Sequence, residues 1–362
     1  MATVAAARNA LGRRPVRAAA KLSLILILAA GLAGLTLVAA PARAGGGPGT
    51  VTTPLIGAAP APDAGFGPGL AAPVGEERRR SAFGKDWQHC VQVVADLRAE
   101  HPTVPLVVLL GGSSARECTV RDGDWEHQIK RRSGFVVDAY NLGSRHRTYA
   151  QDLAFVKLLP GNVPTIVYIG VNLGRFCLPV TSASIRLPKP RRLSYYHQHI
   201  YSEDHIQSYA EKRYYVSFWL SAHYPEFRAC YSSELGMLQQ IIRVCRRRHL
   251  RVALVDLPRD LPAIGSSFDG PVSRYHAGCS SLAGAWSIPW LHFNGAAHFV
   301  DGDFFDIFHL VEPGRVKFQS ILSDKTIRLL KRYHMPKPTP SPSPSPSPSP
   351  SPSASASPAP AG

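Results

Sequence analysis

Four short stretches of this chain carry the residue types that ester cleavage requires. In chain order they are Gly111-Gly112-Ser113-Ser114, Asn141-Leu142-Gly143, Gly170-Val171-Asn172 and Asp306-Ile307-Phe308-His309. A hydroxyl nucleophile, an imidazole base, a carboxylate that orients the base, and N–H donors for the oxyanion are the parts needed for acyl transfer. Each stretch is common by itself. The hypothesis therefore requires all four to meet in space.

The nucleophile and its base have definite candidates. Ser113 follows paired glycines at the end of an apolar run, and Ser114 is the alternative nucleophile if the register shifts by one residue. His309 is predicted to take the serine proton, and Asp306, three residues earlier, to fix its tautomer and orientation. Asp303 is a second carboxylate candidate, six residues before the histidine.

Three groups are predicted to stabilise the developing oxyanion. They are the backbone amides of Ser113 and Gly143 and the side-chain amide of Asn172. Removing one such donor typically costs about 2.7–4 kcal/mol of transition-state stabilisation. If either Gly143 or Asn172 stood alone, a role in turn geometry would be the ordinary explanation of its residue type.

The elements between these stretches predict how they are positioned. Apolar runs indicate strands over 105–110, 135–140, 164–169 and 251–256, and helical spacing indicates helices over 86–100, 124–132, 149–159, 234–247 and 316–330. From Ser113 to Gly143 is 30 residues and from Gly143 to Asn172 is 29, each about one strand-helix-strand unit. The stretches should therefore recur at one edge of a parallel sheet, where ligands gather.

With Ser, Gly, Asn and His blocks in this order, the chain resembles the SGNH hydrolases, the GDSL-type esterase superfamily. The resemblance implies an α/β, flavodoxin-like three-layer sandwich with a mainly parallel five-stranded sheet of order 2-1-3-4-5. It also implies the triad and oxyanion hole named above, and we expect no cofactor. Gly112 stands where the first block usually has Asp, and Leu173 where the third often has Asp. Neither position holds the triad carboxylate, so the departures bear on substrate rather than mechanism.

Composition divides the chain into four parts. Residues 1–44 are basic, then apolar, then end in small residues, as expected of a signal peptide or an uncleaved signal anchor. A Gly/Ala/Pro-rich linker is predicted over 45–77 and a Pro/Ser-rich tail over 335–362. The folded domain is predicted over 78–334, with an irregular insertion at about 174–230 that serves as a lid or as a structural cap.

The charge of the chain indicates the location of the protein and its binding partners. The formal charge is +16, and removal of the leader would leave +10. Basic runs at 78–80, 186–192 and 246–248 indicate either a solvated face or affinity for an anionic envelope polymer. We expect a secreted or envelope protein that touches the membrane only through its N-terminal segment. The chain has no recognised nucleic-acid motif, so no nucleic acid is expected as a partner.

The cysteine and histidine patterns bear on disulfides and metal sites. Six cysteines in an exported chain permit three disulfides, and Cys118 and Cys177 could meet if they follow neighbouring strands. His197-x-His199 with Asp204-His205 has the wrong spacing for the usual metallo-hydrolase pattern. We therefore predict disulfides and no metal.

Three functions follow from these residues. The first is a secreted or envelope-tethered serine esterase that cleaves an O-acetyl or short acyl ester of a small molecule or envelope glycan through an acyl-enzyme. The second is an O-acyltransferase that delivers the same acyl group to an envelope polysaccharide. The third is a catalytically silent carbohydrate-binding domain that uses the same cleft.

Overall fold

The computed structural model describes residues 75–179, 183–190 and 199–336. The predicted leader, the linker up to residue 74 and the tail from residue 337 lie outside the described residues. Within the described ranges, no helix combines the length and hydropathy needed to cross a membrane.

The core of the fold is a five-stranded sheet of order β2-β1-β3-β4-β5 with every neighbouring pair parallel. The predicted flavodoxin-like fold class and its strand order 2-1-3-4-5 are confirmed. The strands are β1 (Leu106–Gly111), β2 (Asp138–Gly143), β3 (Thr165–Val171), β4 (Arg251–Asp256) and β5 (Trp290–His292). Gly111 lies opposite Gly143, so the first two sequence blocks end at the same edge of the sheet.

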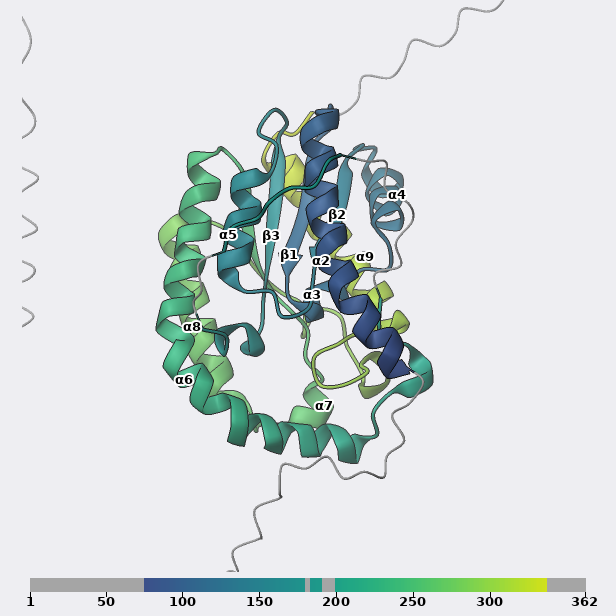
Figure 1. The fold of residues 1–362 in the computed structure, drawn as a ribbon, viewed down its shortest axis with the longest axis vertical. Helices are drawn as coiled ribbons and strands as arrows, with labels where there is room; N and C mark the ends of the chain where they lie inside the picture. The colour runs from purple at the N-terminus through teal and green to yellow at the C-terminus, as the bar shows by residue number, and fades with distance from the viewer. Residues whose placement is uncertain (1–74, 180–182, 191–198, 337–362) are drawn as a thin grey trace, which may run out of the picture. The chain divides into compact units, whose positions relative to one another are not determined.

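Helices cover both faces of the sheet (Figure 1). The first layer holds α2 (Gly75–Glu100), α5 (Tyr149–Leu158), α6 (Tyr209–Arg247) and α8 (Asp269–Trp286), and the second holds α4 (Asp122–Ser133) and α9 (Glu312–Arg332). Two short helices, α3 (Ser113–Arg116) and α7 (Leu261–Ile264), follow β1 and β4.

Side-chain alternation along the strands explains the two layers. Val108 and Leu110 of β1 pack in the core with α2, α5 and α6, whereas Val107 and Leu109 pack with α4 and α9. All six residues of β1 are buried, as the continuous apolar run predicts for a central parallel strand.

The irregular structure expected over 174–230 is replaced by a helix in its second half. Residues 209–247 form one helix, α6, of 39 residues, although Pro225 lies inside it. Its start is fixed by a capping box in which the Ser208 hydroxyl accepts from the Glu211 amide and the Glu211 carboxylate accepts from the Ser208 amide. Val216, Trp219 and Phe227 then bury the inner face of the helix.

The predicted disulfides are not supported. All six cysteines are free thiols, and Cys118 and Cys177 lie in the cores on opposite faces of the sheet. Cys118 Sγ donates to Ser114 O at 3.0 Å and Cys177 Sγ to Leu173 O at 3.5 Å. The sheet separates this pair, although the two residues follow neighbouring strands.

A glycine sets the contact between β2 and α3. A Cβ added at Gly143 would lie 2.3 Å from the backbone nitrogen of Arg116, whereas one added at Gly112 would meet nothing closer than 3.9 Å. Overpacking of this kind costs about 1–3 kcal/mol or more. We therefore expect Gly143→Ala to lower the free energy of unfolding in chemical denaturation, with Gly112→Ala as the matched control. Equal stability of the two variants would contradict this packing.

Candidate active site

Ser113, His309 and Asp306 meet at the carboxyl edge of the sheet, although 196 residues separate the serine from the histidine. His309 Nε2 lies 2.8 Å from Ser113 Oγ. His309 Nδ1 lies 2.7 Å from Asp306 Oδ2 and 2.9 Å from Asp306 Oδ1. The three side chains therefore form a continuous hydrogen-bonded path from hydroxyl to imidazole to carboxylate, the arrangement in which a serine is activated.

Backbone hydrogen bonds hold the carboxylate in place. Asp306 Oδ1 accepts from the amides of Phe308 and His309 at 2.8 and 2.9 Å. Burial by itself raises the pKa of Asp306, but the nearby His309 and these hydrogen bonds lower it overall. Asp306 therefore stays ionised beside the imidazole, as an orienting carboxylate must.

The tight junction between β1 and α3 positions Ser113. A Cβ added at Gly111 would lie 2.5 Å from Ala115 Cβ, so only glycine fits at this strand end. Ser113 is the first residue of α3, and the first amides of a helix have no intrahelical partner. The Ser113 amide is therefore positioned as a candidate oxyanion donor beside its own hydroxyl.

Ser114, the alternative nucleophile, has a different environment. It is 3% exposed, and its hydroxyl accepts from Asn172 Nδ2 at 2.8 Å. Asn172 Oδ1 in turn accepts from the Arg175 amide at 3.1 Å, which directs the Nδ2 group of the side chain toward the serines. The structure thus brings Asn172 to the site and gives Ser114 a structural partner in place of the histidine.

Gly143, predicted as an oxyanion donor, has another hydrogen-bond partner in the structure. Its amide already donates to Asn141 Oδ1 at 3.0 Å. The glycine is required instead because β2 packs directly on the backbone of α3. Close packing and amide donation both favour glycine, so the residue type could not distinguish them.

A buried ionic network lies directly behind the nucleophile. Glu117 is fully buried and contacts Arg116 at 2.8 Å, Arg315 at 2.6 Å and His199 at 3.1 Å. Arg116 also pairs with Asp86 at 2.9 Å. These pairs join α3 to α2, α9 and the segment that begins at residue 199.

This network positions an aromatic ring that sequence reasoning missed. The Tyr201 ring lies 4.6 Å from the His309 ring and 4.4 Å from that of Phe305, between centroids. Arg315 holds the segment through the Tyr201 carbonyl at 2.5 Å, and Glu117 accepts from the Ile200 amide at 3.2 Å. Tyr201 therefore covers one face of the base, and no motif in the sequence marked it.

Arginine and histidine residues near these loops differ in their surroundings. Arg116 is fully buried in the network, and the Arg145 amide donates to Asp86 Oδ2 at 2.9 Å. His199 contacts Glu117 and the carbonyl of Val120, so it is not grouped with Asp204 and His205 as a metal site. His146 is exposed, and His197 lies outside the described residues.

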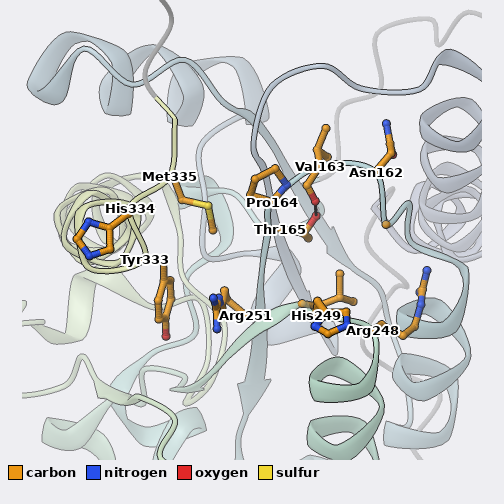
Figure 2. Close-up of a pocket in the computed structure, with 12 residues that line it drawn as sticks. Asn162, Val163, Pro164, Thr165, Arg248, His249, Arg251, Tyr333, His334 and Met335 are labelled. Atoms are coloured by element: carbon orange, nitrogen blue, oxygen red, sulfur yellow. Dashed lines mark hydrogen bonds between the residues drawn. The ribbon is translucent and has the colours of Figure 1, made fainter. Parts of the chain in front are cut away.

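A basic hollow lies at the other edge of the sheet (Figure 2). Pro164 and Thr165 at the start of β3 line it, together with Arg251 at the start of β4 and with Arg248 and Tyr333. Arg248 donates to the carbonyls of Val156 and Leu159, which braces the end of α5. The hollow is at the amino ends of the strands and is separate from the Ser113 site.

The buried network yields a stability prediction. Glu117→Gln removes the charge that faces Arg116 and Arg315, and breaking a buried pair typically costs about 3–5 kcal/mol. We expect a loss of that order in the free energy of unfolding, measured by chemical denaturation. The control is Asp324→Asn, which breaks an exposed pair with Arg132 and should cost at most about 1 kcal/mol. Equal losses in the two variants would contradict the network's importance.

The same carboxylate predicts how stability changes with pH. Burial raises the pKa of Glu117, but Arg116, His199 and Arg315 outweigh it and hold this pKa well below its ordinary value of 4.5. A lowered folded-state pKa stabilises the protein above the unfolded-state value, and this stability is lost as pH falls further. The difference in unfolding free energy between wild type and Glu117→Gln should therefore shrink as pH falls below about 4.5. A difference that stays constant from pH 7 to pH 3 would contradict this assignment.

Comparison with known proteins gives a fold likeness at low identity. No family model matches the chain, and no curated protein matches it significantly. Among solved structures, it is similar to a member of the lipolytic protein G-D-S-L family from Veillonella parvula, at 11% identity and a TM-score of 0.38. That match covers 63% of this chain and 99% of the other.

Two further solved structures have comparable similarity. The acetyl xylan esterase AlAXEase matches at 13% identity and a TM-score of 0.37, covering 62% of this chain and 99% of that one. A GDSL-like lipase from Bacteroides thetaiotaomicron matches at 11% identity and a TM-score of 0.34, covering 66% and 98%. At these values the likeness carries no argument, and the fold and the functional argument come from this chain's own residues.

Proposed function

We propose that this chain, with its SGNH-type strand order, is a serine esterase that cleaves an O-acetyl or short acyl ester. The observation that carries the proposal is the hydrogen-bonded path from Ser113 Oγ through His309 to Asp306, with contacts of 2.8 and 2.7 Å. Ser113 and His309 are partly buried and lie 196 residues apart in the sequence, so the fold and not chain proximity brings them together. The ionised, buried Asp306 supports the same roles.

The proposed reaction has two halves. His309 Nε2 takes the Ser113 proton while Oγ attacks the ester carbonyl, and the Ser113 amide and Asn172 Nδ2 stabilise the oxyanion. The ester C–O bond then breaks, His309 returns the proton to the departing alcohol, and an acyl-serine remains. Water attacks this acyl-serine with His309 again as base, which releases the acid and restores the hydroxyl.

Asn172 is suited to this role because of its second hydrogen. One Nδ2 hydrogen is donated to Ser114 Oγ, and an amide nitrogen carries two. The other can be donated to the oxyanion without breaking the contact that holds the side chain. The Gly143 amide has no such spare hydrogen, so we assign it no part in the reaction.

We further propose that the protein acts in the cell envelope or outside the cell, on an acylated small molecule or glycan. The supporting features are the basic and apolar composition of residues 1–44 and the net positive charge of the remainder, which favours an anionic envelope polymer. Release of the leader would be measured by N-terminal sequencing of the protein recovered from culture medium and membranes. Recovery of full-length chain in the cytoplasm would argue against export.

Hydrolysis is tested with purified protein and p-nitrophenyl esters of increasing acyl length. Turnover of the acetyl ester that falls with chain length supports a short-acyl esterase. An added glycan acceptor distinguishes transfer from hydrolysis, since an acyltransferase would yield acylated glycan in place of free acid. A fluorophosphonate probe, which reacts covalently with an activated serine, gives a second test. If the protein neither turns over the esters nor reacts with this probe, a catalytically silent binding domain is supported instead.

A further inference from the structure

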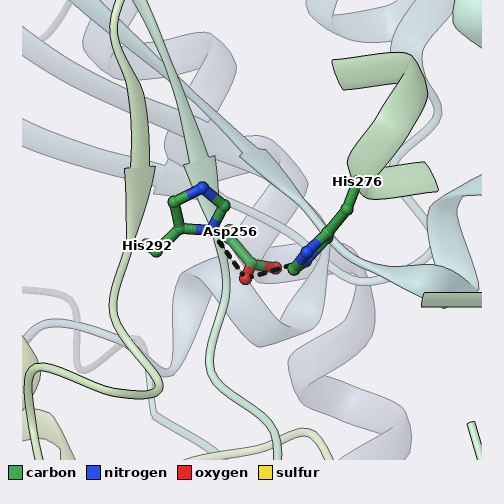
Figure 3. Close-up of side chains that lie close together, drawn as sticks. All are labelled: Asp256, His276 and His292. Carbon is green, nitrogen blue, oxygen red and sulfur yellow. Dashed lines mark hydrogen bonds and ion pairs between the residues drawn. The ribbon is translucent and has the colours of Figure 1, made fainter. Parts of the chain in front are cut away.

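Two histidines and an aspartate converge at the carboxyl edge of the sheet, outside the Ser113 site (Figure 3). Asp256 is the last residue of β4, His292 is the last residue of β5, and His276 comes from α8. One ligand atom from each residue lies within 4.8 Å of the other two. Three elements that are distant in sequence thus direct metal-binding groups at one point.

The distances suit a small tetrahedral ion. His276 Nε2 lies 3.1 Å and His292 Nδ1 lies 3.5 Å from the same oxygen, Asp256 Oδ2. Nitrogen and oxygen ligands about 2.0–2.1 Å from Zn²⁺ are roughly 3.3 Å apart when the geometry is tetrahedral. Both histidine–aspartate contacts are close to that edge length. Ligand atoms of the three residues all lie within 4.8 Å of one another, so an approach of the two histidines would complete the arrangement around an ion.

The remaining oxygen of Asp256 is held by outer groups. Asp256 Oδ1 accepts from the Tyr275 hydroxyl at 2.5 Å and from Arg259 at 2.9 Å. Such contacts fix the direction of a ligating carboxylate and leave Oδ2 to face the histidines. The positive charge of Arg259 weakens the attraction for a dication, so the site should bind more weakly than a closed structural zinc site.

We propose that Asp256, His276 and His292 form a binding site for Zn²⁺ or a similar divalent transition metal, with water in the fourth position. Imidazole and carboxylate ligands suit this class of ion. The two histidine side chains are 29% and 50% exposed, so an ion can reach them from solvent. A bound ion would tie β4, β5 and α8 together.

The proposed metal site is also connected to the loop that carries Asp306 and His309. Four residues after Asp256, the Asp260 amide donates to the Ile307 carbonyl at 3.1 Å, and Ile307 follows Asp306. Fixing the end of β4 should therefore also stabilise the loop that carries the triad carboxylate and histidine.

Zinc binding is tested directly on protein stripped with a chelator and then dialysed. Isothermal titration with ZnCl2 should show one equivalent bound to wild type, together with a rise in Tm. His276→Ala and His292→Ala should each weaken binding at least about tenfold, because even loss of an outer-shell partner costs about 10- to 100-fold and loss of a direct ligand should cost no less. His127→Ala, which removes an exposed histidine of α4, is the matched control and should bind as wild type does.

Cobalt gives a second readout that does not depend on affinity alone. Co²⁺ in the wild-type site should show the intense visible absorption of a four-coordinate ion, and the double variant His276→Ala/His292→Ala should lack it. Circular dichroism confirms that the variants are folded. The proposal is overturned if wild type binds no zinc, or if the folded double variant binds it equally well.

Discussion

Ser113→Ala is expected to lower kcat for p-nitrophenyl acetate by about 10⁴- to 10⁶-fold, the order of loss that follows removal of an activated serine. The reason is that Ser113 Oγ is the hydroxyl that faces His309 Nε2, at 2.8 Å. Without it no acyl-enzyme forms, and only oxyanion stabilisation and binding remain. The rate is measured on protein whose folding is checked by circular dichroism.

Ser114→Ala is the matched control for this loss. Ser114 is buried and accepts from Asn172 Nδ2, so its removal affects catalysis only by loosening that amide. We expect the Ser114 variant to retain far more activity than the Ser113 variant. The reverse order would make Ser114 the nucleophile and would contradict the assigned register.

Asp306→Asn is expected to lower kcat by about 10⁴-fold, since an amide partner favours the wrong histidine tautomer. The backbone amides of Phe308 and His309 can still donate to the remaining side-chain oxygen, so the loop should keep its shape. The loss should therefore appear in kcat rather than in stability, measured by steady-state kinetics and thermal unfolding.

Asp303→Asn is the control for that prediction. Asp303 Oδ2 contacts Lys317 at 2.7 Å and the Val300 amide at 2.8 Å, away from the histidine. Its loss should lower stability and leave kcat of the folded protein within a few-fold of wild type. A large kcat loss in Asp303→Asn with little in Asp306→Asn would give the orienting role to the other carboxylate.

Much of the fold follows from local sequence pattern. The run 106–110 is apolar at every position because β1 is buried on both faces, and the strand 251–256 was predicted at its observed bounds. The first three blocks could be placed together because parallel strands bring their carboxyl ends to one edge of the sheet. The block 306–309 lies in a loop between η3 (Asp301–Asp303) and α9, where strand spacing gives no information. β5 has only three residues, too few for a periodic signal that predicts a strand.

The rest of the fold and of the site depends on tertiary contacts that leave little pattern in the sequence. Pro225 and many aromatic residues made the first part of α6 look irregular, although its second part was predicted as a helix over 234–247 and Ser208 and Glu211 have capping-box spacing at its start. Glu117 belongs to a buried ionic network between distant segments, and this network places Tyr201 beside the site. Such a network has no sequence period, because each charge is placed by a different element.

The most direct test of the proposed chemistry is to map the fluorophosphonate adduct by tandem mass spectrometry of a digest of the labelled protein. A nucleophile activated by His309 predicts one adduct on Ser113 in wild type and none in His309→Ala. An adduct on Ser114, or labelling that persists undiminished without His309, would contradict the account.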